Sequence, residues 1–217
     1  MNVDVLKGRL VFLEPILGTK ALDPKVFESY LNSVAAADES AAAEQTAKQL
    51  ADQKEKAGTT VFHRDDKGLF LWNYQLAGFL KEAGDAIRQC NKGGGEDTED
   101  QKKSKGKKWG SIRSKVDNFV KVRPRMLYIL REGANIVKAD SVLERPLRAN
   151  TMQGPRVSLA RSEVINAGAT ISFEVHVMQN SPVTLDMIRE VLDYGAWKGL
   201  GQWRNAEWGT FKWLESK

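Results

Sequence analysis

Hydrophobic and polar residues alternate strictly along Gly168–Met178, in the last quarter of the chain. One face of this stretch is apolar and the other is polar: Ile171, Phe173, Val175 and Val177 against Ser172, Glu174 and His176. A repeat of two residues is typical of a β-strand that is buried on one side. The pattern therefore predicts a strand that covers a hydrophobic core.

The spacing changes from strand-like to helical directly after this stretch. Apolar residues now recur three and four positions apart, at Leu185, Ile188, Val191 and Leu192. Pro182 suits a first helical turn because it lacks an N–H where no acceptor is needed, and Thr184 can cap that turn. These features predict a helix over Thr184–Tyr194 that packs on a sheet. A glycine-rich segment and a closing strand follow it.

Similar patterns predict more strands in the first part of the chain. Val5–Leu13 alternates, with Lys7 and Arg9 on its outer side. The short stretches Thr59–His63 and Leu69–Trp72 flank a tight turn, which predicts a hairpin. Further along, the apolar run Met126–Leu130 (MLYIL) is typical of a central strand buried on both faces.

A second helix is predicted over Asn73–Arg88, with Asn73 as its cap. Its apolar stripe consists of Leu76, Phe79, Leu80, Ala83 and Ile87.

Two further segments contain few large apolar side chains that could be buried in a core. The alanine-rich segment 21–57 predicts a solvated helical insertion, with a partner-binding arm as the alternative. The charged segment 91–108 cannot offset its ordering entropy and predicts a mobile loop.

Composition narrows the class of protein. The 217 residues suffice for one sizeable domain, so we expect a single domain over 1–217. The sequence shows no signal peptide and no apolar run of ~18 residues, which predicts a soluble cytoplasmic protein. A single cysteine, Cys90, excludes an internal disulfide framework and argues against a cysteine-based metal site. The net charge of +5 is mild, so the placement of the charges matters more than their sum.

Two segments carry charge of one sign. Between Lys102 and Arg131 eleven cations face one acid, Asp117: Lys102, Lys103, Lys105, Lys107, Lys108, Arg113, Lys115, Lys121, Arg123, Arg125 and Arg131. With Trp109 and Phe119 interleaved, this run favours nucleic-acid binding over an ordinary solvated face. The segment Arg145–Arg161 has four arginines and no acid. Its prolines and glycine predict a loop or a hairpin.

Three stretches together resemble the RAMP superfamily, the RNA-binding proteins of CRISPR systems. They are "GLGQWRNAEWGTFKW" near the C-terminus, "FLWNYQLAGFLKEAGDAIR" from Phe70, and the opening "LKGRLVFLEPILGT". In that family a G-x-G turn, a basic residue and a further glycine precede the last strand of an RRM-like core. The matching positions here are Gly199, Gly201, Arg204, Gly209 and Phe211. Glu207 departs from the pattern, because it puts a carboxylate where relatives approach phosphate.

The resemblance implies an α+β fold with an RRM-like, ferredoxin-like core. We expect a four-stranded antiparallel sheet backed by two helices, decorated by the insertion at 21–57 and by a basic loop or hairpin at 91–161. It also implies a non-catalytic protein without cofactor or metal, which binds single-stranded RNA and works as a homo-oligomer or as a ribonucleoprotein subunit. Guanidinium groups hold phosphate bidentately and stack on bases. The candidate nucleic-acid-binding residues are Lys81, Lys107, Lys108, Arg113, Lys115, Arg148, Arg156, Arg161, Lys198, Gly199, Gly201, Trp203 and Arg204.

Two other functions stay open at this point. The first is a metal-independent endoribonuclease that processes guide RNA, with His63 as its general base near the ribose 2′-OH. His176 and the acidic turn at Asp65 and Asp66 are weaker candidates, better explained as a sheet histidine and a hairpin tip. The second is a decoy or interaction protein that mimics a RAMP subunit. No phosphate-binding loop, nucleophile elbow or HExxH motif is present, which favours a protein that is not an enzyme.

Overall fold

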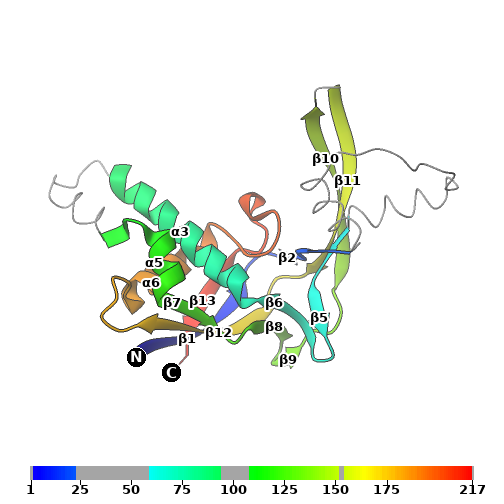
Figure 1. Ribbon diagram of the computed structural model, residues 1–217. Coiled ribbons are helices and arrows are strands. Elements are labelled where there is room, and N and C mark those ends of the chain that lie inside the picture. The colour runs from blue at the N-terminus through cyan, green and yellow to red at the C-terminus, as the bar shows by residue number, and fades with distance from the viewer. Residues whose placement is uncertain (1, 23–58, 94–107, 152–153, 217) are drawn as a thin grey trace, which may run out of the picture.

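The computed structural model describes residues 2–22, 59–93, 108–151 and 154–216. In these ranges the protein is α+β, with two largely antiparallel sheets and three α-helices (Figure 1). The helices are α3 (Asn73–Gly93), α5 (Ile112–Phe119) and α6 (Leu185–Asp193). Within the same ranges, no helix combines the length and the apolar composition that crossing a membrane requires.

The larger sheet has eight strands among the described residues. Its main order is β13-β1-β12-β8-β6-β5, with β7 also paired to β12 and β9 to β8. The strands are β1 (Val3–Phe12), β5 (His63–Asp65), β6 (Gly68–Trp72), β7 (Val120–Arg123), β8 (Met126–Arg131), β9 (Ala134–Asn135), β12 (Thr170–Met178) and β13 (Phe211–Glu215). The chain order β1, α3, β7–β8, β12, α6, β13 and the spatial order β13-β1-β12-β8 are compatible with a ferredoxin-like core.

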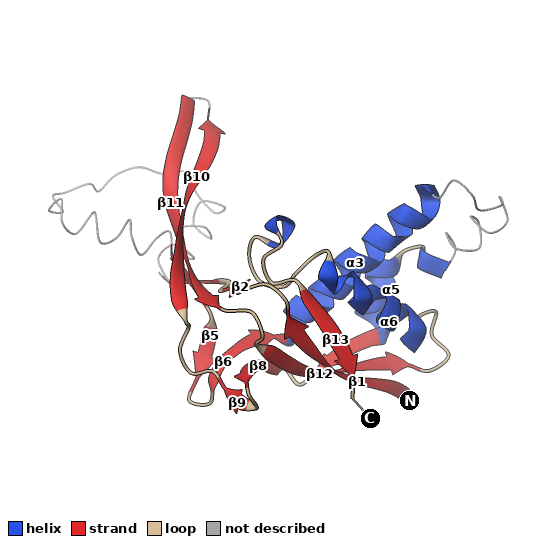
Figure 2. Ribbon diagram, turned by 180° about the vertical axis from the view of Figure 1, so that it is seen from behind, coloured by secondary structure: helices blue, strands red, loops and turns tan. Residues whose placement is uncertain are grey.

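Strand alternation decides which face of this sheet is covered. On β12 the predicted apolar set, Ile171 to Val177, is buried, and the polar set is not. The same alternation buries Leu6, Leu10 and Phe12 on β1. All three helices lie on the side to which these residues point (Figures 1 and 2). The opposite face of the sheet has no helix over it among the described residues.

Local chemistry fixes where α3 and α6 begin. Thr184 caps α6 as expected, because its side-chain oxygen accepts from the Met187 N–H at 3.3 Å. Asn73 does not cap α3: its side-chain amide donates to the Val122 carbonyl at 2.9 Å instead. The Gln75 side chain reaches back to the Trp72 N–H at 3.0 Å and satisfies that donor. The N-terminal end of α3 is therefore anchored to β7.

A smaller sheet carries the arginine-rich segment. β10 (Ser141–Thr151) and β11 (Gly154–Ile165) form the predicted hairpin, which extends away from the body of the protein (Figure 2). At its base β11 pairs with β2 (Ile16–Leu17) and, in parallel, with β4 (Thr59–Val61), which pairs in turn with β3 (Lys20–Ala21). These are five strands among the described residues.

The structure confirms some of the elements predicted from the sequence and corrects others. The strand stretches Val5–Leu13 and Gly168–Met178 and both helices are confirmed. The predicted hairpin is present as β5–β6, but Thr59–Val61 forms β4 of the smaller sheet and is not its first strand. The expectation that Met126–Leu130 is buried on both faces is wrong, because only Leu127 and Ile129 are buried and the residues between them are half-buried.

The main sheet is larger than the expected four strands because β5, β6, β7 and β9 extend it. The segment 91–161 is not only decoration, since β7 and β8 are part of the sheet. α3 continues to Gly93, so the proposed loop 91–108 begins inside a helix. The remainder of that loop, 94–107, and nearly all of the insertion 21–57 lie outside the described residues.

Candidate nucleic-acid interface

The helix-free face of the larger sheet, called the open face below, gathers basic side chains. Residues directly opposite each other on antiparallel strands share a face, so the register places its side chains in rows. One row runs Arg123–Glu174–Lys7 and the next Lys121–His176–Val5. Arg9 lies opposite Ser172 and Leu214, and Lys212 opposite Val11. The cations of the open face are Lys7, Arg9, Lys121, Arg123 and Lys212.

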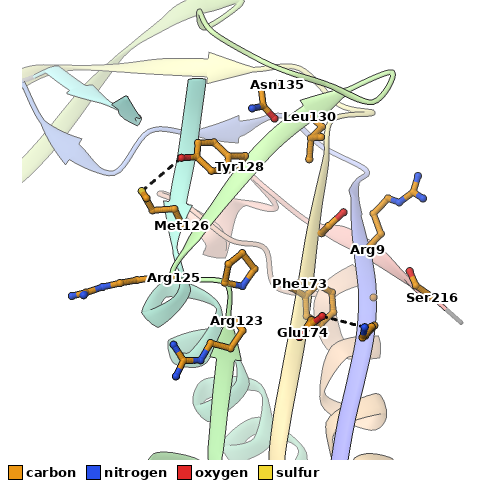
Figure 3. A pocket seen from close by; sticks show the side chains of 14 residues that line it. Arg9, Arg123, Arg125, Met126, Tyr128, Leu130, Asn135, Phe173, Glu174 and Ser216 are labelled. Atoms are coloured by element: carbon orange, nitrogen blue, oxygen red, sulfur yellow. Dashed lines mark hydrogen bonds and ion pairs between the residues drawn. The ribbon is translucent and has the colours of Figure 1, made fainter. Parts of the chain in front are cut away.

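An interruption in strand pairing opens a cleft in this face. β7 ends at Arg123 and β8 begins at Met126, so Ser172 and Phe173 of β12 have no partner on that side. A cleft of about 780 Å³ lies there, within the ~300–1,000 Å³ that is usual for ligand pockets. Its lining includes Lys7, Arg9, Arg123, Arg125, Met126, Tyr128, Leu130 and Glu174. Figure 3 shows Arg123 and Arg125 on one side of the cleft and Arg9 on the other.

The charges of the cleft are unbalanced. Glu174 is the single acid of its lining, and it is already engaged by Lys7 at 3.4 Å and by His176 at 3.0 Å. The hydrogen bond from His176 is the main reason that the pKa of Glu174 lies below its usual value. Arg9 and Arg123 have no ion-pair partner in the parts of the chain that the structure describes. The cleft therefore presents positive charge that is free to hold an anion.

One aromatic side chain of the cleft lining, Tyr128, lies on the β6 side and packs against the aromatic residues of that strand. The Tyr128 hydroxyl donates to Asp65 Oδ2 at 2.6 Å, which lowers the pKa of Asp65 and raises that of Tyr128. The Tyr128 ring packs against Phe70 with centroids 5.8 Å apart. Trp72 contacts Phe70 in turn, at 5.1 Å and nearly perpendicular. Apolar and aromatic surface thus adjoins the cations, which is the combination that single-stranded nucleic acids require.

The predicted basic residues of the helical layer lie away from this face, and most are paired. Lys81 contacts Asp117 at 2.9 Å, and Arg113 contacts Asp85 at 3.6 Å. Lys108 lies 3.5 Å from Glu190 on α6, and the Lys115 ammonium donates to the Lys108 carbonyl at 3.0 Å. Lys107 lies outside the described residues. Trp109, expected to interleave with this run as a stacking residue, is instead buried in the core at 1% exposure.

The glycine-rich turn, Lys198–Phe211, also directs its cations inward. Lys198 and Arg204 both contact Glu82 of α3, each at 3.0 Å. Burial alone would raise the pKa of Glu82, but the hydrogen bond from Lys198 and the charge of Arg204 lower it below its usual value. Trp203 has the Arg145 guanidinium 3.9 Å over its ring and Trp208 stacked 6.4 Å away.

The glycines of this turn approach the chain's own backbone. A Cβ at Gly199 would overlap the backbone of Trp208 and Gly209. Gly201 has φ +87°, and a Cβ there would lie 2.7 Å from the Leu17 carbonyl oxygen of β2. Only glycine fits such a conformation without strain. These glycines therefore join the turn to β2 and close it on itself.

The hairpin holds the remaining candidates. The structure describes the backbone of Arg148 on β10 and Arg156 on β11, two positions of one antiparallel ladder. Arg161, nearer the base, contacts Glu144 across the hairpin at 3.0 Å. The twelve predicted residues that the structure describes are thus distributed over the helical layer, the glycine-rich turn and the hairpin, and they do not come together into one site.

The imidazole of the nuclease candidate His63 packs against aromatic side chains of β6. The ring stacks on Phe70 at 5.8 Å and meets Trp72 edge-on at 5.7 Å. Burial, with a smaller effect of the Lys20 charge, lowers the pKa of His63 below its ordinary value. Among the described residues, no group of three histidine, cysteine or acidic side chains could hold a metal ion.

Sequence reasoning missed the open face as a unit. The sequence places Lys7 and Arg9 on the outer side of a strand and Lys121, Arg123 and Arg125 in a basic run, but it does not predict that they share one surface. The sequence does contain one signal for this face, because cations alternate with buried valines along Val120–Arg123. An outward cation on two strands predicts a basic face only once the strands are known to share a sheet.

Comparisons with known proteins give distant structural neighbours. No protein-family model and no curated protein sequence matches the chain. One similar solved chain belongs to a "Type IV-B CRISPR Complex", with a TM-score of 0.48, 11% identity and coverage of 98% of this chain and 90% of that one. Another belongs to the "Cryo-EM structure of the Type III-B Cmr-beta bound to cognate target RNA", with a TM-score of 0.36, 11% identity and coverage of 97% and 60%. At these values the similarities assign neither a family nor a function.

Proposed function

We propose that this protein binds single-stranded RNA across the open face of its sheet, without cleaving it. The observation that carries the proposal is the cleft between β1 and β8, where Arg9, Arg123 and Arg125 meet a single, already paired acid. Guanidinium groups hold phosphate bidentately, and the neighbouring Tyr128 and Leu130 offer apolar surface to bases. A flexible single strand can enter such a cleft because its bases are not held in a stack.

The proposal includes the fold and the family. The spatial order β13-β1-β12-β8, with α3 and α6 on one face, supports a ferredoxin-like, RRM-like core. The three sequence stretches that resemble the RAMP superfamily support a relationship to guide-RNA-binding subunits. RNA is proposed over single-stranded DNA on that resemblance, so both nucleic acids belong in the test.

In this proposal the protein works in the cytoplasm as one subunit of a ribonucleoprotein complex, alone in several copies or with other proteins. The extended β10–β11 hairpin supports such an assembly, because it projects far from the body that it belongs to (Figure 2). We expect no cleavage of RNA by the wild type, with or without divalent metal, and His63→Ala should bind RNA as the wild type does.

The salt dependence of RNA affinity tests the proposal. If about four phosphates are neutralised, the slope of log affinity against log salt should be about −3 for a single strand. Replacing Arg9 and Arg123 together by alanine should make that slope shallower by about 1.4, because two phosphate contacts are lost. The measurement is a fluorescence-anisotropy titration of a labelled oligouridine at several salt concentrations, with oligothymidine as the DNA arm.

The matched control replaces two cations of the helical layer, Lys81 and Arg113, by alanine. The control changes the net charge equally but leaves the open face intact, so its slope should equal that of the wild type. Equal slopes for the open-face variant and the wild type would overturn the proposal, as would the absence of binding at low salt.

A further inference from the structure

A second, smaller pocket adjoins the cleft at the N-terminal end of α3. It has a volume of about 340 Å³ and lies between the first turn of the helix and strand β7. Arg123 and Arg125 line both this pocket and the larger cleft. A strand that occupies the cleft can therefore continue into the pocket past these two side chains.

The pocket has an aromatic wall that faces solvent. Tyr74 lines it and is 61% exposed, so its ring is accessible to a ligand. One face of the Tyr74 ring stacks on Trp72, with centroids 6.3 Å apart and planes 14° from parallel. Trp72 is held in place by Phe70 at 5.1 Å and by the Arg125 guanidinium at 5.8 Å from its ring centroid. Tyr74 is thus held by its contact with Trp72, whose own position is fixed by two further side chains.

The polar lining of the pocket is positive. Lys121, Arg123 and Arg125 contribute three cations, and the lining contains no acid. At the start of the helix the Asn73 N–H is already used, because it donates to the Arg125 carbonyl at 2.9 Å. The Asn73 side chain is also engaged, by the Val122 carbonyl. The charged groups that the pocket lining offers to an anion are therefore these three side chains.

We propose that this pocket binds one nucleotide of the strand, with its base stacked on Tyr74 and its phosphate held by Lys121 and Arg123. The chemistry fits that ligand class, since a planar apolar surface beside clustered cations matches a base joined to a phosphate. The volume is at the lower end of the ~300–1,000 Å³ of ligand pockets, which suits a single nucleotide. Stacking tolerates any base, so the subsite selects for an unpaired nucleotide rather than for a sequence.

This inference rests on the proposed function, and the experiment separates the two. The probe is a labelled uridine 12-mer, and a second 12-mer with abasic sites keeps the phosphates but removes the bases. Tyr74→Ala should weaken the uridine 12-mer about 10-fold, with the salt slope unchanged, because stacking releases no counterions. The abasic 12-mer should bind Tyr74→Ala and the wild type equally. Tyr74→Phe keeps the ring and should restore the affinity for uridine.

The phosphate part of the subsite has its own variant. Lys121→Ala should make the salt slope shallower by about 0.7 for both 12-mers, since one phosphate contact is lost. The control is Trp197→Ala, which removes an aromatic ring that is 81% exposed elsewhere on the surface. It should leave both affinities unchanged. Melting temperatures of all variants confirm that they are folded.

The outcomes are distinguishable. If the wild type binds with a slope that depends on Arg9 and Arg123, but Tyr74→Ala binds the uridine 12-mer as tightly as the wild type, the nucleotide subsite is wrong and RNA binding on the open face stands. If Tyr74→Ala weakens binding of the abasic 12-mer as much as binding of the uridine 12-mer, Tyr74 acts through the fold. The stacking role is then wrong. If the wild type binds neither 12-mer, both proposals are wrong.

Discussion

The open face and the glycine-rich turn carry the same kinds of residue and use them differently. Both hold arginine and lysine beside aromatic rings. In the turn, Lys198 and Arg204 converge on one carboxylate, Glu82, and so hold the turn against α3. On the open face, Arg9 and Arg123 point away from the core and have no acid to pair with among the described residues.

The difference shows that a basic residue is informative about function only after its partners are known. A paired cation of intermediate exposure stabilises the fold modestly, and it must give up its partner before it can hold phosphate. A cation without a partner can neutralise phosphate without such a loss. The turn with the family-like glycines is therefore built as a structural junction, and the open face has the electrostatics of a binding surface.

Gly199→Ala is the variant with the largest expected effect, and it tests whether the glycine-rich turn serves the fold. A methyl group there would overlap the backbone of Trp208 and Gly209, which cannot move aside as a side chain can. We expect the free energy of unfolding to fall by about 3 kcal/mol or more, at the upper end of overpacking effects. Urea unfolding followed by tryptophan fluorescence measures the change.

The control for this variant is Gly78→Ala in α3, where nothing lies within 4 Å of the new methyl group. A mid-helix glycine costs roughly 0.5–1 kcal/mol relative to alanine, so this control should gain stability. A Gly199→Ala protein of normal stability that has lost RNA binding would reverse the comparison, because the turn would then serve the ligand and not the fold.

A smaller effect is expected from Glu82→Gln, which removes the shared carboxylate charge of the turn. Its two partners are about one-third exposed, so the loss of stability should be about 1 kcal/mol. The RNA salt slope should stay unchanged, since Lys198 and Arg204 lie on the helix side of the sheet. A steeper slope would show instead that these two cations reach phosphate once they are released.

The smallest effect is a pH dependence confined to the turn. The pKa of Glu82 is lower in the folded protein than in the unfolded chain, so its ion pairs contribute stability above the ordinary glutamate pKa. This contribution is lost as the pH falls through the lowered, folded-state value. Melting temperatures of the wild type and of Glu82→Gln should therefore differ at pH 6 and converge in strongly acidic solution. A constant difference across this range would argue against the ion pairs as its cause.

Much of the fold was readable from spacing. The alternation in Gly168–Met178 and the helical repeat after Thr184 correspond to β12 and α6, because burial on one face leaves a period in the sequence. The turn sequence between His63 and Gly68 likewise predicts a hairpin at the position of β5–β6, but not that Thr59–Val61 leaves it for the smaller sheet. Such signals are local and need no knowledge of the neighbouring strands.

The site was less readable, because it depends on which strands meet. Arg9 and Arg123 are more than a hundred residues apart in sequence, and only the pairing of β12 with both β1 and β7 places them on one face. Trp109 shows the reverse error: it stands in a basic run and looks exposed, yet its ring is buried against the core. Charge runs also conceal ion pairs such as Lys81 with Asp117, which join segments distant in sequence.

The smaller sheet has a consequence for how the chain reaches its native state. Its hairpin joins two neighbouring strands, and hairpins of this kind close within microseconds. Its attachment to the body is different, because Thr60 meets Ser162 across a separation of 102 residues. Closing so long a loop costs entropy before any contact rewards it, so non-local pairing slows folding. We therefore expect the hairpin to form early, and β2, β3 and β4 to join it only after the main sheet has brought their segments together.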